Sequence, residues 1–275
     1  MPDGEQQSRI IFGHPEFGPR VVEAFPRFFE VLPRANDALI SLTDRGYDPI
    51  NPLQRSILNL ASYVAIAAVE AITLVGNGLG SGAMKVLRGM LESTINAEYL
   101  RLNPAELDNY LNWGWVEQHR QLNFIEDHRP DLYAQIRPDI VVQTEREWNR
   151  VRNSFEFTDR AGRLRLRDSW TPLSLADRAV RTNLIEPYRH IYPIGSRLVH
   201  ATALGLAMHF SPEEDPHRLA APPTLLYCGE ALVGTHLCII SVTRTLSQAV
   251  EVEPTPPLDE LERNFQYAWG DRGVA

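Results

Sequence analysis

A long apolar segment near the start of the chain constrains the fold more than any other feature. Residues 53–75 are the most hydrophobic helical stretch, and Asn51 followed by Pro52 is typical of a helix start, with Asn51 as the N-cap. Residues 56–75 are almost long enough to cross a bilayer, but aromatic and basic belts do not flank them. Polar residues also interrupt them, namely Asn59, Ser62, Glu70 and Thr73. We therefore expect a central helix buried in a helical protein, and no membrane partner.

Glu70 is an acid in the middle of this apolar helix. A carboxylate that is buried without a partner is costly, because the apolar interior does not solvate its charge. The sequence therefore predicts a cationic partner for Glu70.

Most of the remaining chain also shows helical periodicity between proline and glycine breaks. We expect further helices at about 21–42, 83–101, 104–127, 130–153, 186–200 and 225–250. The fold class predicted is all-α, a single multi-helix bundle. Its expected organisation is a flexible N-terminal arm over 1–18, a helical domain over 19–250, and a C-terminal tail with a short helix over 251–275.

Residues 158–168 are the exception to the helical pattern. Thr158 to Gly162 is typical of a turn, and arginine and leucine alternate with period two after it, which predicts a short β-hairpin. The segment holds the one local basic patch of the sequence, formed by Arg160, Arg163, Arg165 and Arg167. Two interpretations stay open: contacts to RNA phosphates, or a solvated edge strand whose charges discourage pairing.

Composition narrows the classes of partner and the compartment. The chain has 275 residues with 27 basic and 35 acidic side chains, a net charge of −8, which argues against non-specific wrapping of nucleic acid. Cys228 and Cys238 are the two cysteines, and their spacing fits neither a close-spaced zinc motif nor a disulfide framework. The N-terminus lacks the pattern of a signal peptide. We expect a cytoplasmic protein.

One segment, residues 186–200, concentrates the side chains that could form a site. Pro193 removes a hydrogen bond within the expected helix, and Gly195 permits close approach of another backbone. Polar side chains recur at every fourth residue, so they form a gently spiralling stripe on one side of the helix. The members of the stripe are Tyr188, Tyr192, Ser196 and His200.

A second polar stripe lies on the helix expected over 83–101. Its members fall within about 100° of one another on a helical wheel, and they are Lys85, Arg88, Glu92, Asn96 and Tyr99. Arg88 and Glu92 have the i, i+4 spacing of an ion pair. They could form a solvated face with a weak salt bridge, or Arg88 could turn inward to meet Glu70 or the stripe that ends at His200.

The two stripes resemble the bacterial domain-of-unknown-function family 5677. The residues that carry the resemblance are the run from Arg88 through Glu92 and Asn96 to Tyr99, Trp170, and the Tyr-x3-Tyr-x3-Ser-x3-His pattern from Tyr188 to His200. The resemblance covers roughly residues 55–245 in the spacing of elements. It implies an all-helical fold without a reaction to transfer, and it implies that Arg88 and Glu92 face inward.

A looser similarity is to the helical HEPN domains, many of which are ribonuclease toxins. Those domains place four to six residues between an Arg and a His, whereas Arg197 precedes His200 by three positions. The similarity implies a metal-independent ribonuclease, a toxin or phage-defence effector. In it His200 would act as general acid or base, Arg197 or Arg88 would hold the phosphate, and Tyr192 and Ser196 would orient the substrate.

Three hypotheses of function follow. The first is a ligand-binding or structural polar centre made by Arg88, Glu92, Tyr192, Ser196 and His200, and the second is the HEPN-like ribonuclease. The third, a metal site, would draw on acids such as Glu70 and Glu98, but the Glu-x-x-His pair of such bundles does not occur, so we expect no metal and no cofactor. The C-terminal tail helix is expected to dock onto the body or onto a second subunit of a homodimer.

Overall fold

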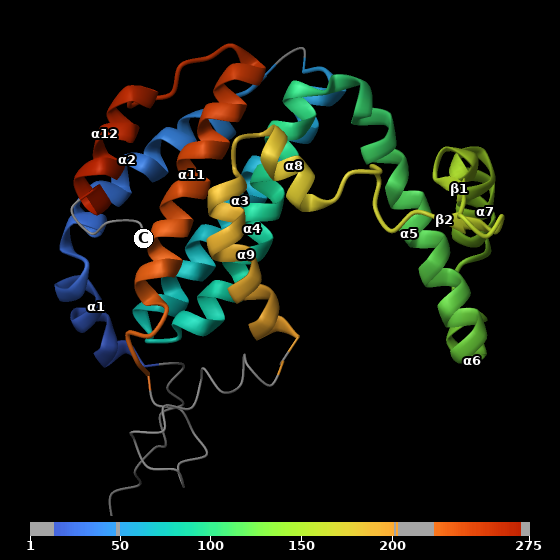
Figure 1. Ribbon diagram of the computed structural model, residues 1–275, viewed down its shortest axis with the longest axis horizontal. Helices are drawn as coiled ribbons and strands as arrows, with labels where there is room; N and C mark the ends of the chain where they lie inside the picture. Colours follow the sequence, from blue (N-terminus) through green and yellow to red (C-terminus); the bar gives the residue numbers. More distant parts are fainter. Residues whose placement is uncertain (1–13, 48–49, 201, 203–222, 271–275) are drawn as a thin grey trace, which may run out of the picture. The chain divides into compact units, whose positions relative to one another are not determined.

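The computed structural model describes residues 14–47, 50–200, 202 and 223–270. These residues form α-helices and one two-stranded hairpin, so the predicted all-α fold class is confirmed (Figure 1). The chain packs as two compact units, Met1–Arg101 with Thr182–Ala275, and Leu102–Arg181. The expected single domain over 19–250 stays a prediction, because this division does not say whether the two units fold together.

Helix α3, Pro52–Gly76, begins as the sequence predicts. The Asn51 side chain accepts a hydrogen bond from the Gln54 backbone at 2.9 Å, and the Gln54 side chain accepts one from the Asn51 backbone at 3.1 Å. This reciprocal pair is a capping box, which satisfies two backbone N–H groups that the helix itself leaves unpaired. One face of α3, including Ile57, Ala61 and Val64, is fully buried, and α3 packs against helix α11, Cys228–Val250.

The opposite face of α3 is exposed, so the helix predicted to be buried and central is buried on one face only. Tyr63, Ile66 and Val69 are 48%, 64% and 64% exposed. Glu70 lies on this face in contact with solvent, so the predicted need for a cationic partner is wrong, because water solvates the carboxylate. By length and composition alone, α3 is the one helix of the described chain that could cross a membrane.

The first two helices of the chain each begin with a proline in the first turn. After the short turn η1, Pro15–Phe17, come helix α1, Gly18–Ala24, and helix α2, Pro26–Thr43. Pro26 occupies the first turn of α2, where its missing N–H costs nothing, and Pro33 lies inside α2 without ending it. Of the arm expected over 1–18, residues 15–18 belong to η1 and the start of α1, with Phe17 buried, and residues 1–13 lie outside the described chain.

Helix α12, Leu258–Trp269, docks on the body of its own chain, against α2 and α11 (Figure 1). The Trp269 indole Nε1 donates a hydrogen bond to Nδ1 of His236 on α11 at 3.1 Å, and both residues are buried. The His236 ring also contacts Phe28 and Phe265, with ring centroids 5.7 and 5.2 Å away. An ion pair between Arg34 and Glu260, at 2.6 Å, joins α12 to α2 at the surface.

The second unit is built from shorter elements. They are η2 Pro104–Glu106, α5 Leu107–His128, α6 Pro130–Tyr133, α7 Pro138–Val151, η3 Arg152–Ser154, β1 Glu156–Thr158, β2 Leu164–Leu166 and α8 Leu175–Arg181. The single helix expected over 130–153 is wrong. Pro138 cannot donate the backbone hydrogen bond that would continue α6, and a new helix begins at this proline after a turn.

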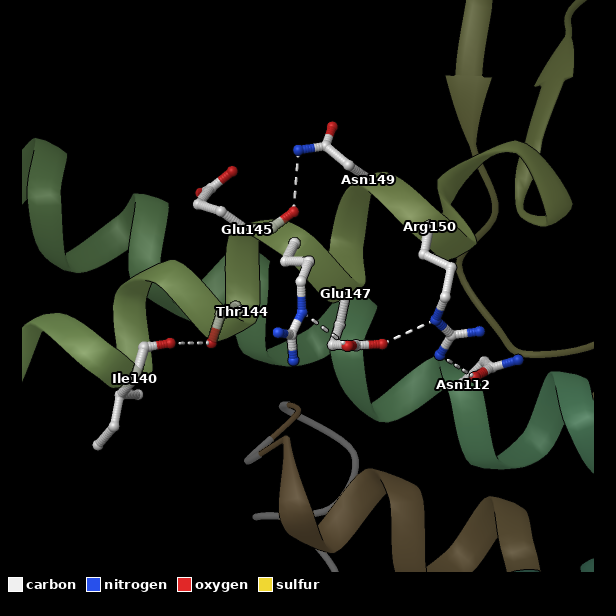
Figure 2. Close-up of polar contacts among 8 residues, drawn as sticks. Asn112, Ile140, Thr144, Glu145, Glu147, Asn149 and Arg150 are labelled. Carbon is white, nitrogen blue, oxygen red and sulfur yellow. Dashed lines mark hydrogen bonds and ion pairs between the residues drawn. The ribbon is translucent and has the colours of Figure 1, made fainter.

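Polar contacts connect α7 to α5 within this unit (Figure 2). Arg150 donates to the Asn112 side-chain oxygen on α5 at 3.0 Å, while the Glu147 carboxylate accepts from Arg150 at 2.7 Å and from Arg146 at 3.2 Å. Such exposed ion pairs contribute little free energy each. Trp113 of α5 packs edge-on against the buried Phe155 ring, with centroids 5.2 Å apart.

The predicted hairpin is present, with strands that begin two residues earlier than expected. β1 and β2 are antiparallel, and Phe157 pairs with Arg165. The Asp159 carboxylate accepts hydrogen bonds from Arg163 at 3.0 Å and from Arg165 at 3.2 Å. These two ion pairs compensate part of the positive charge of the basic patch predicted at Arg160, Arg163, Arg165 and Arg167.

The buried His236 should make stability depend on pH. Burial lowers its pKa from 6.5 to about 4, so between these values the unfolded chain binds a proton that the folded chain excludes. The stabilisation that neutral His236 adds to the free energy of unfolding is therefore complete above pH 6.5. It declines as pH falls toward 4, by about 3 kcal/mol in all. We expect the free energy of unfolding in urea to fall over this window and to fall less in His236→Gln.

The matched control for that measurement is His128→Gln, because His128 is an exposed histidine at the end of α5. It should retain the wild-type dependence on pH. An equal slope for His236→Gln and wild type between pH 6.5 and 4 would contradict the assignment of the pH dependence to His236.

Candidate functional site

The two helices that carry the predicted stripes contact each other closely. They are α4, Gly80–Leu102, and α9, Ile185–Val199, which continues through Pro193. A Cβ atom placed on Gly195 would lie 2.7 Å from the Met84 carbonyl oxygen and 2.9 Å from the Arg88 Cβ. Real side chains do not approach that closely, so the absence of a side chain at Gly195 sets the distance between α9 and α4. The predicted close approach at Gly195 is confirmed.

This contact brings Arg88 of α4 to the tyrosines of α9. The Arg88 Nη2 donates a hydrogen bond to the Tyr192 hydroxyl at 2.9 Å, and its guanidinium carbon lies 4.7 Å from the centre of the Tyr192 ring. The Tyr188 ring stacks on the Tyr192 ring, with centroids 4.9 Å apart and planes 20° apart. Arg88 therefore turns toward Tyr192 and away from Glu70, the acid it was considered to meet.

Arg88 and Glu92 are both half-buried, but Arg88 donates to Tyr192 and does not form the predicted i, i+4 ion pair with Glu92. The Glu92 charge acts instead on Tyr188. Burial raises the pKa of Tyr188, the adjacent Tyr192 adds to the rise, the Arg88 charge opposes it, and the Glu92 charge adds to it. Arg88, Glu92, Tyr188 and Tyr192 thus form one electrostatically coupled group, which we name the arginine–tyrosine cluster.

The charge of Arg88 is not balanced by a carboxylate in the part of the chain that the structure describes. Its hydrogen-bond acceptor there is the neutral Tyr192 phenol, and its Nε is buried without a partner. A guanidinium carries five N–H donors and is best satisfied by a carboxylate or phosphate that accepts two of them in parallel. The cluster therefore holds an oriented cation with unused capacity to bind an anion.

The remaining predicted residues lie farther along α9. At about 1.5 Å per residue, Ser196 is about 6 Å and His200 about 12 Å along the helix axis from Tyr192. Ser196 is half-buried, and His200 is exposed at the end of the helix, where its backbone N–H donates to the Ser196 carbonyl at 3.0 Å. The predicted stripe is therefore real as a line on α9, but the Arg88 contact forms at its Tyr192 end.

Arg197 belongs to the His200 end of the helix. It is half-buried, and its charge acts on Tyr227, the residue before α11. Burial raises the pKa of Tyr227, Glu230 adds to the rise, and Arg197 opposes it. Arg197 and His200 thus lie on the same final turn of α9, separated along the helix from the arginine–tyrosine cluster.

The acids considered for a metal site are also separated. Glu70 is exposed on α3, whereas the Glu98 carboxylate accepts two hydrogen bonds from Arg101, at 2.8 and 2.7 Å, and one from the Thr245 hydroxyl at 2.9 Å. Among the residues whose positions are described, no group of three or more His, Cys, Asp or Glu side chains is placed to hold a metal ion.

Tyr188 belongs to the predicted stripe, and it is the member of the cluster that the predicted polar centre left out. Its position one turn before Tyr192 on the same face was visible in the sequence. A stack of two rings at i and i+4 could therefore have been proposed from spacing alone. What spacing could not provide is the partner helix, because Arg88 lies 104 residues away from Tyr192 in the chain.

The comparison with protein families identifies the chain. The model of DUF5677, a family of unknown function, matches residues 55–217, which is more than half of the chain, and the chain belongs to this family. The match includes α4 and α9 and so contains the whole arginine–tyrosine cluster. Comparison with curated proteins and with solved structures gave no match.

Alanine at Gly195 should separate the two helices of the site. The added methyl group would collide with the Met84 carbonyl oxygen and the Arg88 Cβ, so we expect a loss of about 1–3 kcal/mol in the free energy of unfolding. The control is Gly76→Ala at the end of α3, where a Cβ meets no described atom within 4 Å. There the substitution should stabilise by about 0.4–1 kcal/mol. Equal effects at both positions would contradict the close contact.

Proposed function

We propose that this DUF5677 member binds a small anionic ligand at the contact between α4 and α9, with Arg88 as the residue that holds the anion. The observation that carries the proposal is the Arg88 guanidinium, which is half-buried, oriented by Tyr192 and without a carboxylate partner in the described chain. Partial burial of a cation costs free energy unless an anion or strong acceptors compensate it. A bound carboxylate or phosphate would supply that compensation.

The geometry of the arginine favours a flat, two-oxygen group over a point charge. A guanidinium binds carboxylate and phosphate through parallel N–H···O hydrogen bonds, and the hydrogen bond and ring contact with Tyr192 fix the plane of the Arg88 fork. Orientation before binding reduces the entropy that the side chain would lose on binding. Arg88 is therefore suited to recognition of a defined anionic group more than to general attraction of anions.

The two tyrosines and Glu92 would set which anions bind. The stacked rings of Tyr188 and Tyr192 provide an aromatic surface next to the cation, which favours a ligand with an aromatic group attached to its anionic group. The Glu92 carboxylate is close enough to act on Tyr188, and it would repel an anion placed on the wrong side of the cluster. The ligand class we propose is thus an aromatic phosphate or carboxylate.

A metal-independent ribonuclease is the second candidate. It is favoured by the position of Arg197 and His200 on one turn of α9, with His200 exposed and free of ion pairs to described acids. An exposed imidazole can transfer a proton, and a guanidinium on the same turn can bind a phosphate. The separation of this turn from Arg88, about 12 Å along the helix, makes it a different site from the one proposed above.

Phenyl phosphate is the probe we choose for the anion site, because it combines one aromatic ring with one phosphate. We expect it to raise the melting temperature of the wild-type protein in a saturable manner, since a ligand that binds the folded state stabilises it. Phenol, which lacks the anion, should have no effect, and inorganic phosphate should have a weaker one. In Arg88→Gln and in Arg88→Lys the shift should disappear, the lysine variant because it keeps the charge but loses the fork.

The matched control for these variants is Arg189→Gln on α9. Arg189 is an exposed cation that pairs with Glu186 at 2.9 Å, so its loss should leave the phenyl phosphate shift unchanged. A shift that survives in both Arg88 variants would show that Arg88 is not the anion-binding residue, and the proposal would fail.

Cleavage of single-stranded RNA in the presence of a chelator tests the second candidate. If this second candidate is wrong, wild type and His200→Ala should show the same background cleavage. Cleavage that is lost in His200→Ala, with an unchanged melting temperature, would instead support the ribonuclease and assign its acid–base group. A circular dichroism spectrum of each variant confirms that the helices are intact.

A further inference from the structure

The outward face of α3 has the composition of an interface. Its exposed side chains include Tyr63, Ile66 and Val69, which are 48%, 64% and 64% exposed. They follow one another at i, i+3 and i+6, so they form a continuous ridge that crosses the helix surface diagonally. The other face of α3 is already buried against the rest of its unit. The apolar surface of this helix therefore exceeds what the described residues of its own chain cover.

Polar side chains border the ridge on the same outward side of the helix. They are Asn59, Ser62, Glu70 and Thr73, all exposed or half-buried. An apolar centre with a polar border is the usual anatomy of a protein–protein interface, because the centre is desolvated and the border stays in contact with water. We name these four residues, together with Tyr63, Ile66 and Val69, the α3 face.

Helix α4 supports one edge of the α3 face. The Tyr63 hydroxyl lies so close to Gly89 that a Cβ on that glycine would be 2.8 Å from it. The absence of a side chain at Gly89 therefore lets the Tyr63 side chain lie against α4 at the edge of the ridge. A fixed aromatic side chain contributes contact area at little cost in conformational entropy.

We propose that the α3 face is the contact surface of a homodimer, with the two-fold axis passing close to Ile66. A symmetric dimer interface must be complementary to itself, since the same residues come from both copies. When two α3 helices pair antiparallel about Ile66, Tyr63 of one copy meets Val69 of the other. Asn59 meets Thr73 and Ser62 meets Glu70 in the same way. Apolar residues thus face apolar residues, and polar residues face polar residues.

The charges of the face are compatible with this arrangement. Glu70 carries the charge nearest the centre, and it is four residues from Ile66. In the antiparallel pair the two Glu70 carboxylates lie on opposite sides of the axis, about 12 Å apart along the helices, which exceeds the screening length at physiological ionic strength. Each carboxylate instead lies opposite Ser62 of the other copy, a neutral polar side chain whose hydroxyl donates to the Leu58 carbonyl of its own helix at 2.9 Å.

A lipid surface is a poorer occupant of the same face. Cytoplasmic membrane surfaces are negatively charged and attract clusters of lysine and arginine. Glu70 and the exposed Arg55 on the same side of α3 offset each other, but the chain as a whole has a net charge of −8. Electrostatic repulsion would therefore oppose the docking of this face on an anionic bilayer, whereas a second copy of the chain meets it with matched groups.

Disulfide formation across the axis is the most specific test. Only a residue near a two-fold axis lies next to its own copy, and packed helices are close enough at such a position for a disulfide bond. Ile66→Cys should therefore form a cross-linked dimer under mild oxidation. Ile40→Cys is the control, because Ile40 is a 50% exposed isoleucine on α2, and it should stay uncross-linked.

The native thiols should not interfere with this test. Cys228 and Cys238 are buried, and burial raises the pKa of their thiols to about 11 and about 12. Thiol oxidation proceeds through the thiolate, which these cysteines do not form near neutral pH. Wild-type protein treated in parallel provides the background.

A second pair of variants measures the association itself. Wild type should have twice the 31.1 kDa mass of one chain by light scattering. Ile66→Glu places two carboxylates at the axis and should weaken the dimer at least about 100-fold, while Ile40→Glu should leave it unchanged. Circular dichroism confirms that each variant is folded, which is expected because both positions are exposed.

Three results would overturn the proposal. They are a wild-type protein that stays monomeric at the highest soluble concentration, an Ile66→Glu variant that remains dimeric, and cross-linking of Ile40→Cys as efficient as that of Ile66→Cys. Monomeric wild type that cosediments with phosphatidylcholine vesicles would do so as well, and would assign the face to lipid.

Discussion

The packing of α3 against α11 is the contact on which the first unit depends. α11 also touches α2, α9 and α12, so its position decides where each of them lies. Its buried side chains line most of its circumference, from Ala231 and Leu232 to Val242 and Leu246. A helix that is buried over most of its circumference lies at the centre of its bundle. α3, by contrast, packs one face against α11 and presents the other to solvent. It therefore lies at the edge of the unit, although its sequence is as apolar as that of a central helix.

The arginine–tyrosine cluster depends in turn on a single missing side chain. Gly195 lets α9 approach the Met84 carbonyl oxygen of α4, and this approach places the Tyr192 ring beside Arg88. A hydrogen bond between long side chains on two separate helices costs conformational entropy on both sides. Close backbone packing reduces that cost, because it leaves each side chain few other positions. The orientation of Arg88 is therefore a property of the helix contact more than of the arginine itself.

Local features of the structure could be predicted from the sequence, and features that depend on a distant partner could not. The Asn51 cap and the hairpin are decided by residues a few positions apart, so their patterns suffice. Glu70 was misjudged because hydropathy measures how apolar a helix is and not which of its faces is covered. The Arg88–Glu92 spacing predicted an ion pair, but the competing acceptor, the Tyr192 hydroxyl, comes from another helix. The predicted spacing of the stripe from Tyr188 to His200 was correct. His200, however, lies about 12 Å along the helix axis from Tyr192, so it is not next to Arg88.

The anion site and the proposed dimer surface share α4 without depending on each other. Successive residues of a helix project about 100° apart, so Arg88 turns toward α9 while its neighbour Gly89 lies under Tyr63 of α3. Substitutions at Arg88 change the guanidinium and leave the backbone at Gly89 in place. Conversely, a charge at Ile66 alters the outward face of α3, on the side of that helix opposite to its buried core. Loss of ligand binding and loss of association are therefore separable in this chain, and a variant that abolishes both would indicate that α4 itself has moved.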